Sequence, residues 1–323
     1  MQDIVPNICS GKDKISNSGK VVLYGSTGVI GKTDFASYKK NIVLVARVGA
    51  NAGQLQIGNA PCGVTDNTLV IDAKEWNYYI YYFLQHYNLN RLVFGSGQPL
   101  ITGGMLKKIK VGHGNKVERI KITRLLCLLD KRIATQNKII ERYESLIRGI
   151  AQKIARNNKP NVFLAECLKC SSSTLQESDV CENGTYPVYG ANGIVGYLDG
   201  YSTEDEAVHI IKDGSGVGTV SYVTGKCSAT GTLNTLQAKD GYLLQYLYYM
   251  LKVFNFEPYK TGMAIPHIYF KDYGKAKIFC PSYTEQLKYV DLLSAIDNKL
   301  SVEQRILTNL SLQKQYLLRL MFI

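Results

Sequence analysis

The sequence of 323 residues is an internal duplication, and this limits the possible folds more than any other feature. Residues 24–31 return as residues 189–196, with the same tyrosine and the same three glycines, 165 positions later. The same separation relates residues 47–53 to residues 212–218, and a separation of 167 holds from residue 67 onward. Chance similarity would not keep its register over such a distance, so we expect two copies of one fold.

Each copy begins with a part that is rich in Gly, Tyr, Val and Ile. Short apolar runs such as residues 42–46 and 209–211 are separated by turn signals such as residues 49–51. This pattern predicts a mostly β domain of short strands. One helix is expected within each of these parts, over residues 76–86 and residues 243–253.

Each copy ends in a long helix. Residues 117–155 contain no proline and a single glycine, and apolar residues recur there in steps of four and three. This is a heptad seam, and it is interrupted by a polar residue at Gln136 and again at the repeat position Glu303. We expect these seam residues to pair the two helices: Leu126, Leu129, Ile133, Ile140, Tyr143 and Ile147 with Leu293, Ile296, Leu300, Leu307, Leu310 and Leu317.

A helix of nearly forty residues is about 57 Å long and must bury its apolar stripe. The alternative is that each helix packs onto its own β domain, but heptads sustained over the whole helix favour pairing between the two. The expected fold class is α+β, in which the two helices form an antiparallel coiled coil with an internal pseudo-two-fold. The expected segments are a first β domain at 1–114, a central helix at 115–157, a second β domain at 158–281 and a distal helix at 282–323.

Composition excludes several classes of protein. Hydrophobic residues make up 46% and charged residues 20%, as in a folded domain. The longest apolar runs are too short to cross a membrane, and no basic segment leads into an apolar stretch as in a secretory signal, so a cytoplasmic protein is expected. Lys and Arg exceed Asp and Glu by 38 to 26, and this net charge of +12 favours a nucleic-acid partner.

The eight cysteines are expected to be reduced thiols. Cys167 and Cys170 have the spacing of half a zinc site, but neither Cys181 nor His209 completes it, so we expect no metal. The Gly25, Gly28 and Gly31 triplet resembles a dinucleotide loop, but it lies within a β-rich region and recurs in both copies, which favours tight turns. No Walker motif, adenine-methyltransferase segment or nuclease carboxylate cluster is present, so we expect no enzyme activity in this chain.

The order of these parts resembles a known family. The segment 186–196, with its Tyr-Gly-x-x-Gly-x-x-Gly core, and the helix start 281–286 are similar to those of the specificity subunit of type I DNA restriction–modification enzymes. Residues 125–133 look like the spacer region of that family. The resemblance covers essentially the whole chain and keeps the order of recognition domain, helix, recognition domain and helix.

The resemblance implies a non-catalytic subunit that reads double-stranded DNA. Each target recognition domain would read one half of a bipartite asymmetric site, and the helix pair would set the gap and dock two modification subunits. Those methyltransferase subunits would carry S-adenosylmethionine and methylate adenine N6, and restriction subunits would cleave. ATP and magnesium are likewise expected in the partner subunits, with no cofactor in this chain and no membrane partner.

The first copy departs from the family pattern. It lacks a clear Pro-x-x-x-Glu-Gln helix start, and residues 111–118 stand in its place. Fourteen residues separate Ser10 from Tyr24, against eighteen from Ser171 to Tyr189. These differences leave open a silent or orphan specificity cassette. A coiled-coil adaptor that binds protein is the other alternative, and its binding would be insensitive to salt.

The candidate DNA-binding residues are polar side chains at turns of the repeated motif, because base edges are distinguished by such groups. Arg47 and Lys212 occupy equivalent positions, which indicates a shared contact with the DNA backbone. Ser26 and Thr27 differ from Ala191 and Asn192, as readers of different half-sites should. The candidates are Ser26, Thr27, Lys32, Arg47, Asn51 and Gln98 in the first copy, and Asn192, Lys212, Ser215, Lys260, Thr261 and His267 in the second.

Overall fold

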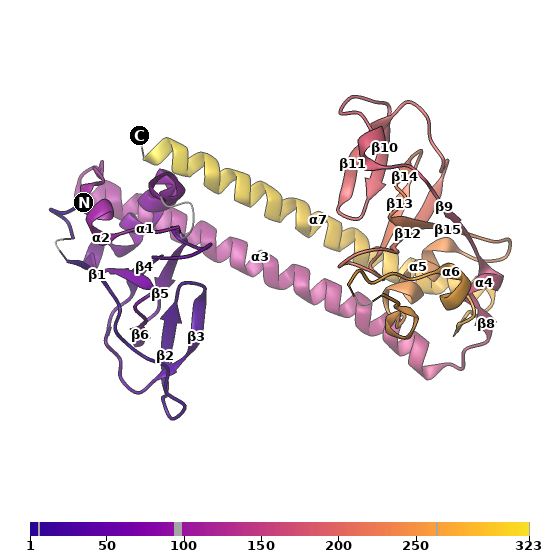
Figure 1. Cartoon of the computed structure of the whole chain (residues 1–323), viewed down its shortest axis with the longest axis horizontal. Coiled ribbons are helices and arrows are strands. Elements are labelled where there is room, and N and C mark those ends of the chain that lie inside the picture. The colour runs from indigo at the N-terminus through magenta and orange to yellow at the C-terminus, as the bar shows by residue number, and fades with distance from the viewer. Residues whose placement is uncertain (6, 94–98, 263, 323) are drawn as a thin grey trace. The chain divides into compact units, whose positions relative to one another are not determined.

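The structure is a computed structural model, and it describes residues 1–5, 7–93, 99–262 and 264–322. The chain divides into two compact units, and each includes parts of both long helices (Figure 1). The first unit combines Met1–Asn137 with Arg305–Ile323, and the second is Lys138–Gln304. None of the helices in the described part of the chain has the length and apolar character that a membrane span requires.

The described residues of the first unit form two sheets and two short α-helices, besides parts of the long helices (Figure 1). One sheet has four strands in the order β1-β7-β4-β5, and the other has three in the order β3-β2-β6. The strands are β1 Ile8–Ser10, β2 Val21–Gly25, β3 Gly28–Thr33, β4 Ile42–Ala46, β5 Leu55–Gly58, β6 Cys62–Val64 and β7 Thr68–Ile71. The helices are η1 Lys74–Trp76, α1 Asn77–Tyr87, η2 Leu89–Leu92 and α2 Gly103–Lys108.

The second unit repeats this topology. Its four-stranded sheet has the order β13-β12-β15-β9 and its three-stranded sheet the order β11-β10-β14, which match the first unit strand for strand. The predicted duplication is therefore confirmed in the fold. The elements are β8 Val162–Phe163, α4 Leu164–Cys167, β9 Leu168–Ser172, η3 Glu177–Asp179, β10 Tyr186–Gly190, β11 Gly193–Leu198, β12 Glu206–Ile211, β13 Val220–Thr224, β14 Ser228–Ala229, β15 Leu233–Ala238, α5 Leu244–Lys252, η4 Glu257–Tyr259, α6 Phe270–Tyr273 and β16 Lys277–Ile278.

Strand β4 contributes side chains to two hydrophobic clusters of the first unit, one on each face of its sheet. Its five residues are all apolar and at most 1% exposed, as expected for a strand that is covered on both faces. Val43 and Val45 pack in the cluster that contains α1, whereas Ile42 and Leu44 pack with residues of the three-stranded sheet. The alternation of side chains along one strand therefore joins α1 to the second sheet.

The predicted short helices are confirmed to within one residue, as α1 and α5. The long helices are α3 Lys116–Asn157, with 42 residues, and α7 Tyr283–Met321, with 39 residues. Both are continuous, because neither contains a proline and the heptad pattern favours helix throughout.

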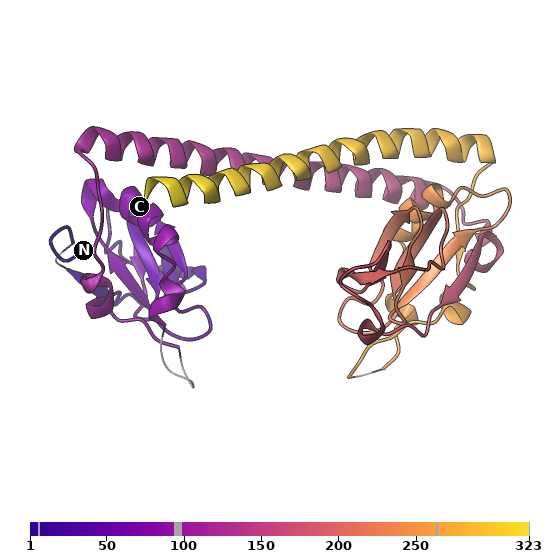
Figure 2. The same ribbon diagram turned by 90° about the horizontal axis from the view of Figure 1, so that it is seen from above.

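In the first unit, the start of α3 lies against the end of α7, so the two segments run antiparallel (Figures 1 and 2). Leu126 of α3 is fully buried in one cluster with Leu318 and Phe322, and the ring of Phe322 lies 5.2 Å from that of Tyr79 on α1. The Lys314 ammonium lies 2.6 Å from an oxygen of Asp130. The helices therefore pack on each other and on the β domain at once, although the sequence pattern alone left these as alternatives.

In the second unit, the end of α3 and the start of α7 meet α5. A groove there is lined by Ile147 and Ala151 of α3, by Leu300 of α7, and by Tyr248 and Lys252 of α5. The first unit thus holds the start of α3 and the end of α7, and the second unit holds the end of α3 and the start of α7. This is the antiparallel arrangement that the heptads predict.

Burial along the long helices follows the predicted seam. Leu125, Leu128 and Leu146 lie off the seam and are 43–55% exposed, and Gln136 at the polar break is only 2% exposed. The pairing of particular seam residues with one another stays a prediction. Leu126, Ile140, Ile147, Leu293 and Leu300 are buried, and Leu129, Ile133, Tyr143, Ile296, Leu307, Leu310 and Leu317 are half-buried.

The starts of the two long helices are capped at equivalent positions, but by different hydrogen bonds. Asn115 and Glu118 exchange side-chain hydrogen bonds with each other's backbone N–H groups, at 2.9 and 3.0 Å. At the repeat positions, the Ser282 hydroxyl donates to the Glu285 carboxylate at 2.9 Å. The divergent helix start of the first copy is therefore a working capping box.

At the junction between the short and the long helix, the two copies use equivalent positions but make different contacts. In the second unit, Gln286 is 1% exposed and its side-chain oxygen accepts from the backbone N–H of Leu243 at 2.9 Å. The repeat positions in the first unit hold Arg119 and Trp76, and the guanidinium lies 3.4 Å from the centre of the indole ring. A cation–π contact thus takes the place of a hydrogen bond.

In both units a tyrosine hydroxyl of the short helix donates to an aspartate of the long helix. The Tyr82 hydroxyl donates to the Asp130 carboxylate at 2.8 Å, and its repeat counterpart Tyr249 donates to Asp297 at 3.4 Å. Burial and the neighbouring carboxylate raise the pKa of Tyr82 far above its usual range. We expect Tyr82→Phe to lower the free energy of unfolding by about 1.5–3 kcal/mol, because the bond is buried and charge-assisted.

Chemical denaturation of the purified protein measures this loss. Tyr316→Phe is the matched control, because Tyr316 lies on α7 and is 63% exposed. Equal stability of the two variants would contradict a structural role for the Tyr82 bond.

A buried histidine makes the second unit sensitive to acid. His209 is 1% exposed, it lies against the ring of Tyr189, and neither ring nitrogen has a hydrogen-bond partner among the described residues. Burial lowers the pKa of His209 from 6.5 to about 4, because the charged ring would be desolvated. The repeat position in the first unit is the apolar Leu44, so the polar ring is not required by the fold.

Between pH 6.5 and pH 4 the unfolded chain binds a proton at His209 that the folded chain does not, so stability falls as the pH falls. The full loss amounts to roughly 3 kcal/mol. We expect His209→Leu to remove this pH dependence and to raise stability at neutral pH. Denaturant unfolding at pH 7 and pH 4.5 tests this, and parallel pH profiles of the two proteins would contradict it.

Candidate nucleic-acid interface

A short turn brings two loops of the first unit to one edge. The turn joins β6 to β7, and Thr65 donates its backbone N–H to the Tyr24 carbonyl, at the end of β2, at 3.0 Å. Two residues later, the Asn67 carbonyl accepts from the backbone N–H of Arg47, at the end of β4, at 2.9 Å. The turn therefore ties the β2–β3 hairpin tip to the loop that follows β4.

The second unit has the same connection. Thr230 donates its backbone N–H to the Tyr189 carbonyl at 2.9 Å, and Lys212 donates its own to the Thr232 carbonyl at 3.0 Å. The partners are the repeat counterparts of Tyr24 and Arg47. Both units thus build the same loop edge from backbone hydrogen bonds, which leaves the side chains of these loops free to differ.

The repeated glycines shape the two hairpins. Gly28 and Gly193 have φ values of +115° and +104°, a region that other residues rarely adopt. Each follows a two-residue turn and begins the returning strand, β3 or β11. The predicted tight-turn role of the glycines is confirmed at these positions.

The structure brings four first-copy candidates to the loop edge. Ser26 and Thr27 form the turn of the β2–β3 hairpin, and Gln56 of β5 donates to the Gly25 carbonyl beside them at 2.6 Å. Arg47 is half-buried and its carbonyl accepts from the backbone N–H of Ile101, whereas Asn51 is exposed in the loop before β5. These side chains come from elements that the two sheets hold together.

A groove of about 420 Å³ beside this edge was missed by the sequence reasoning. It is lined by amide side chains from the loop before β5 and from the end of α1, and the buried oxygen of Gln85 has no hydrogen-bond partner among the described residues. The clustering of amides at residues 85–90 could have indicated it. The amide residues of the groove are Asn51, Gln54, Gln85, Asn88 and Asn90.

In the second unit, two loops are joined by a short antiparallel contact. Asp213 pairs with His267, and Gly214 donates its backbone N–H to the Pro266 carbonyl at 2.9 Å. Thr261 and His267 also exchange backbone hydrogen bonds, at 2.9 and 2.8 Å.

The remaining second-copy candidates lie around this contact. Ser215 is exposed in the first of the two loops, and Asn192 is exposed at the turn of the β10–β11 hairpin. Ala191, next to it, packs with Ile211 and so holds the hairpin tip against the end of β12. The Lys212 ammonium donates to the Ser172 hydroxyl at 3.3 Å.

The three remaining candidates are set apart by position, by an ion pair, or by lying outside the described residues. Lys32 is exposed on β3, four residues beyond Gly28 and therefore about 13 Å along the strand from the hairpin turn. Lys260 has its ammonium 2.6 Å from the Glu257 carboxylate, which neutralises its charge. Gln98 falls outside the residues that the structure describes.

The cysteines are all unpaired thiols. Burial raises the pKa of the Cys167 thiol to about 12 and that of Cys170 to about 11, so both remain protonated near neutral pH. Within the described ranges, no three His, Cys, Asp or Glu side chains come close enough together to hold a metal ion.

The sequence profile of one protein family matches the chain twice. The family is described as the type I restriction modification DNA specificity domain, and the matches cover residues 7–145 and 162–312. The chain belongs to this family. The two matches divide the chain as the internal repeat does, so each copy corresponds to one specificity domain.

Two curated relatives agree with this assignment. A putative type I restriction enzyme specificity subunit of Haemophilus influenzae is 30% identical over 123 residues, which are 37% of this chain and 32% of the relative. The EcoprrI type I restriction enzyme specificity subunit of Escherichia coli is 28% identical over 116 residues, which are 36% of this chain and 29% of the relative. The matched segments thus span about a third of each curated relative.

A solved structure has the same fold over nearly the whole chain. The S subunit of a type I restriction–modification system from M. genitalium superposes with a TM-score of 0.71 at 20% identity. The alignment covers 98% of this chain and 93% of that one. The α+β fold of two domains with long helices, expected from the repeat, is confirmed.

Proposed function

We propose that the chain is the DNA sequence-specificity subunit of a type I restriction–modification complex, and that each unit reads one half of a bipartite asymmetric site. One observation carries the proposal: the same loop edge is built twice with different side chains at equivalent positions. In the repeat, Ser26 and Thr27 correspond to Ala191 and Asn192, and Asn51 corresponds to Gly216. A repeated backbone with divergent exposed side chains suits two modules that read different sequences.

The chemistry of the first edge fits base reading. Asn and Gln side chains can donate to and accept from adenine in the major groove, and hydroxyl groups can contact several bases. The amide groove and the Ser26–Thr27 turn supply both kinds of group. Arg47 and Lys212, at equivalent places beside the β6–β7 turn and its counterpart, would contact phosphates in both half-sites.

The long helices support a role as spacer and docking surface. Large apolar side chains lie exposed along both helices, away from the seam, and such surfaces mark interaction sites. In the proposed complex they contact two modification subunits, and restriction subunits join the assembly in the cytoplasm. These exposed residues include Leu125, Leu128, Leu146, Leu292, Leu312, Tyr316 and Leu320.

In the proposed division of labour this chain is not catalytic, as expected for a specificity subunit. S-adenosylmethionine, ATP and magnesium act in the partner subunits, which transfer the methyl group to adenine N6 and cleave DNA. The capping box at Asn115 and Glu118 and the Arg119 contact with Trp76 favour an intact first unit over a silent cassette.

An exchange of recognition domains tests the proposal. We expect replacement of residues 161–280 by the same region of another family member to change only one half of the methylated motif, because the two edges are separate. The motif is read by methylation sequencing of a host that expresses the variant with the modification subunit. The unaltered chain is the control, and a change in both half-sites would contradict modular reading.

A further inference from the structure

The two copies differ sharply in charge over one matched region. Residues 11–41, named here the basic lobe, hold six lysines and two aspartates. The repeat counterpart, residues 176–206, named the acidic lobe, holds seven carboxylates and neither lysine nor arginine. The exchange is direct at one site, where Lys39 and Lys40 of the first copy correspond to Glu204 and Asp205 of the second.

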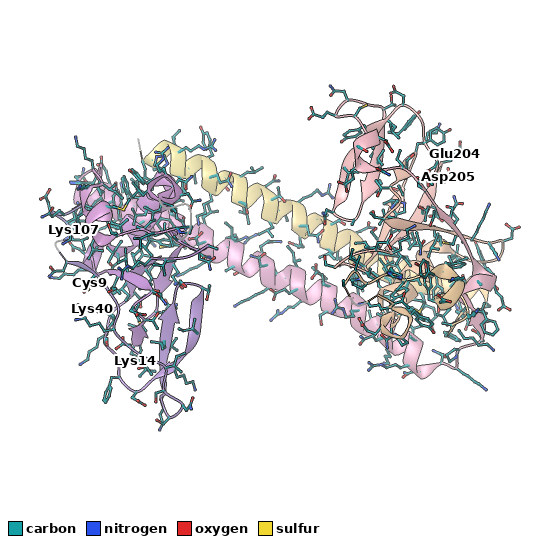
Figure 3. The ribbon with its side chains drawn as sticks, in the orientation of Figure 1. Cys9, Lys14, Lys40, Lys107, Glu204 and Asp205 are labelled. Atoms are coloured by element: carbon teal, nitrogen blue, oxygen red, sulfur yellow. The ribbon has the colours of Figure 1, made fainter. Side chains whose placement is uncertain are left out.

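The lysines of the basic lobe surround the three-stranded sheet of the first unit. Lys32 lies on the edge strand β3, and residues near Lys14 and Lys39 bond to the other edge strand, β6. Figure 3 shows Lys14 and Lys40 at the periphery of the first unit, with Lys107 apart from them on α2. The six lysines are all exposed: Lys12, Lys14, Lys20, Lys32, Lys39 and Lys40.

The two carboxylates of the basic lobe do not neutralise these lysines. Asp13 accepts from the Ser37 hydroxyl at 2.6 Å and from the Val64 backbone N–H at 2.7 Å. Asp34 accepts from the hydroxyl of Ser16 at 2.8 Å. Within the described part of the chain, no carboxylate lies within 4.0 Å of the six ammonium groups, so their charge faces solvent.

The acidic lobe presents the opposite charge on the same scaffold. Six of its seven carboxylates are exposed, and the seventh, Glu206, accepts a hydrogen bond from Tyr222. The charge difference between the copies extends to the whole units. The first unit holds 21 basic and 8 acidic residues, and the second unit holds 17 basic and 18 acidic residues. The net positive charge of the chain therefore belongs to the first unit.

We infer that the basic lobe is a phosphate-binding surface of the first unit, and that the acidic lobe makes no phosphate contacts, while its Ala191–Asn192 turn still faces the bases. The inference rests on the proposed function and adds to it a division of labour. The first unit supplies most of the attraction to DNA, which is independent of sequence and depends on salt. The second unit contributes base reading with much less electrostatic attraction.

Salt titration of DNA binding tests this inference with the assembled complex of this chain and its modification subunits. The variant Lys39→Glu with Lys40→Asp gives the basic lobe the residues of the second copy. We expect its affinity to fall roughly tenfold or more at 0.15 M salt, and the slope of log affinity against log salt to become shallower by about two. Duplexes with the methylated site and with a scrambled sequence should lose affinity equally, since phosphates carry no sequence.

Lys107→Glu with Lys108→Asp is the matched control, because it makes the same change in net charge on α2 of the same unit. Distant charges are screened at this salt concentration, so we expect an affinity within about twofold of the unaltered complex. A second variant, Lys32→Tyr, introduces the residue type of its repeat counterpart, Tyr197. We expect it to make the slope of log affinity against log salt shallower by about one. All variants alter exposed or half-exposed side chains, and thermal unfolding checks that they remain folded.

Unchanged affinity and slope in the basic-lobe variants would overturn the inference, as would an equal loss in the α2 control. Either result would leave the proposed function standing, provided that the unaltered complex binds its site. If the unaltered complex bound neither duplex in a salt-dependent way, the proposed function itself would fail.

Discussion

The contact between each short helix and the two long helices determines how this chain is organised. In the first unit, Tyr79 and Phe83 of α1 pack with Leu126 of α3 and with Leu318 and Phe322 at the end of the chain. Residues as far apart in the sequence as Tyr79 and Phe322 thus complete one core. A recognition domain of this kind cannot be separated from its helices without exposing apolar surface, because the helix ends are part of its interior.

On that core, the turns Thr65–Thr68 and Thr230–Leu233 tie the loops of each edge together through backbone hydrogen bonds. The arrangement explains how two copies can diverge at exposed positions while their sheets keep the same strand order. It also explains the charge difference between the basic and acidic lobes, since exposed lysines and carboxylates do not enter either core. Divergence also reaches a few buried positions, such as His209 against Leu44, where the strand order is still kept.

Much of the fold could be predicted from the sequence, because the repeat and the heptads are periodic signals that packing preserves. Helices α1 and α5 and the glycine turns at Gly28 and Gly193 follow directly from such patterns. The cation–π contact of Arg119 with Trp76 and the amide groove at Gln85 depend on how separate elements meet, which no local pattern encodes. For the same reason, spacing alone placed Lys32 with the hairpin turn, although the strand carries it away.

In the proposed function, one chain directs methylation to a two-part site by reading each half with a separate unit. Methylation sequencing of a host that expresses the chain with its modification subunit, against the same host without this chain, tests it most directly. We expect N6-methyladenine at one asymmetric bipartite motif, and we expect this methylation to vanish when the chain is absent. A stable complex of the chain with its modification subunit that leaves no such motif would contradict it.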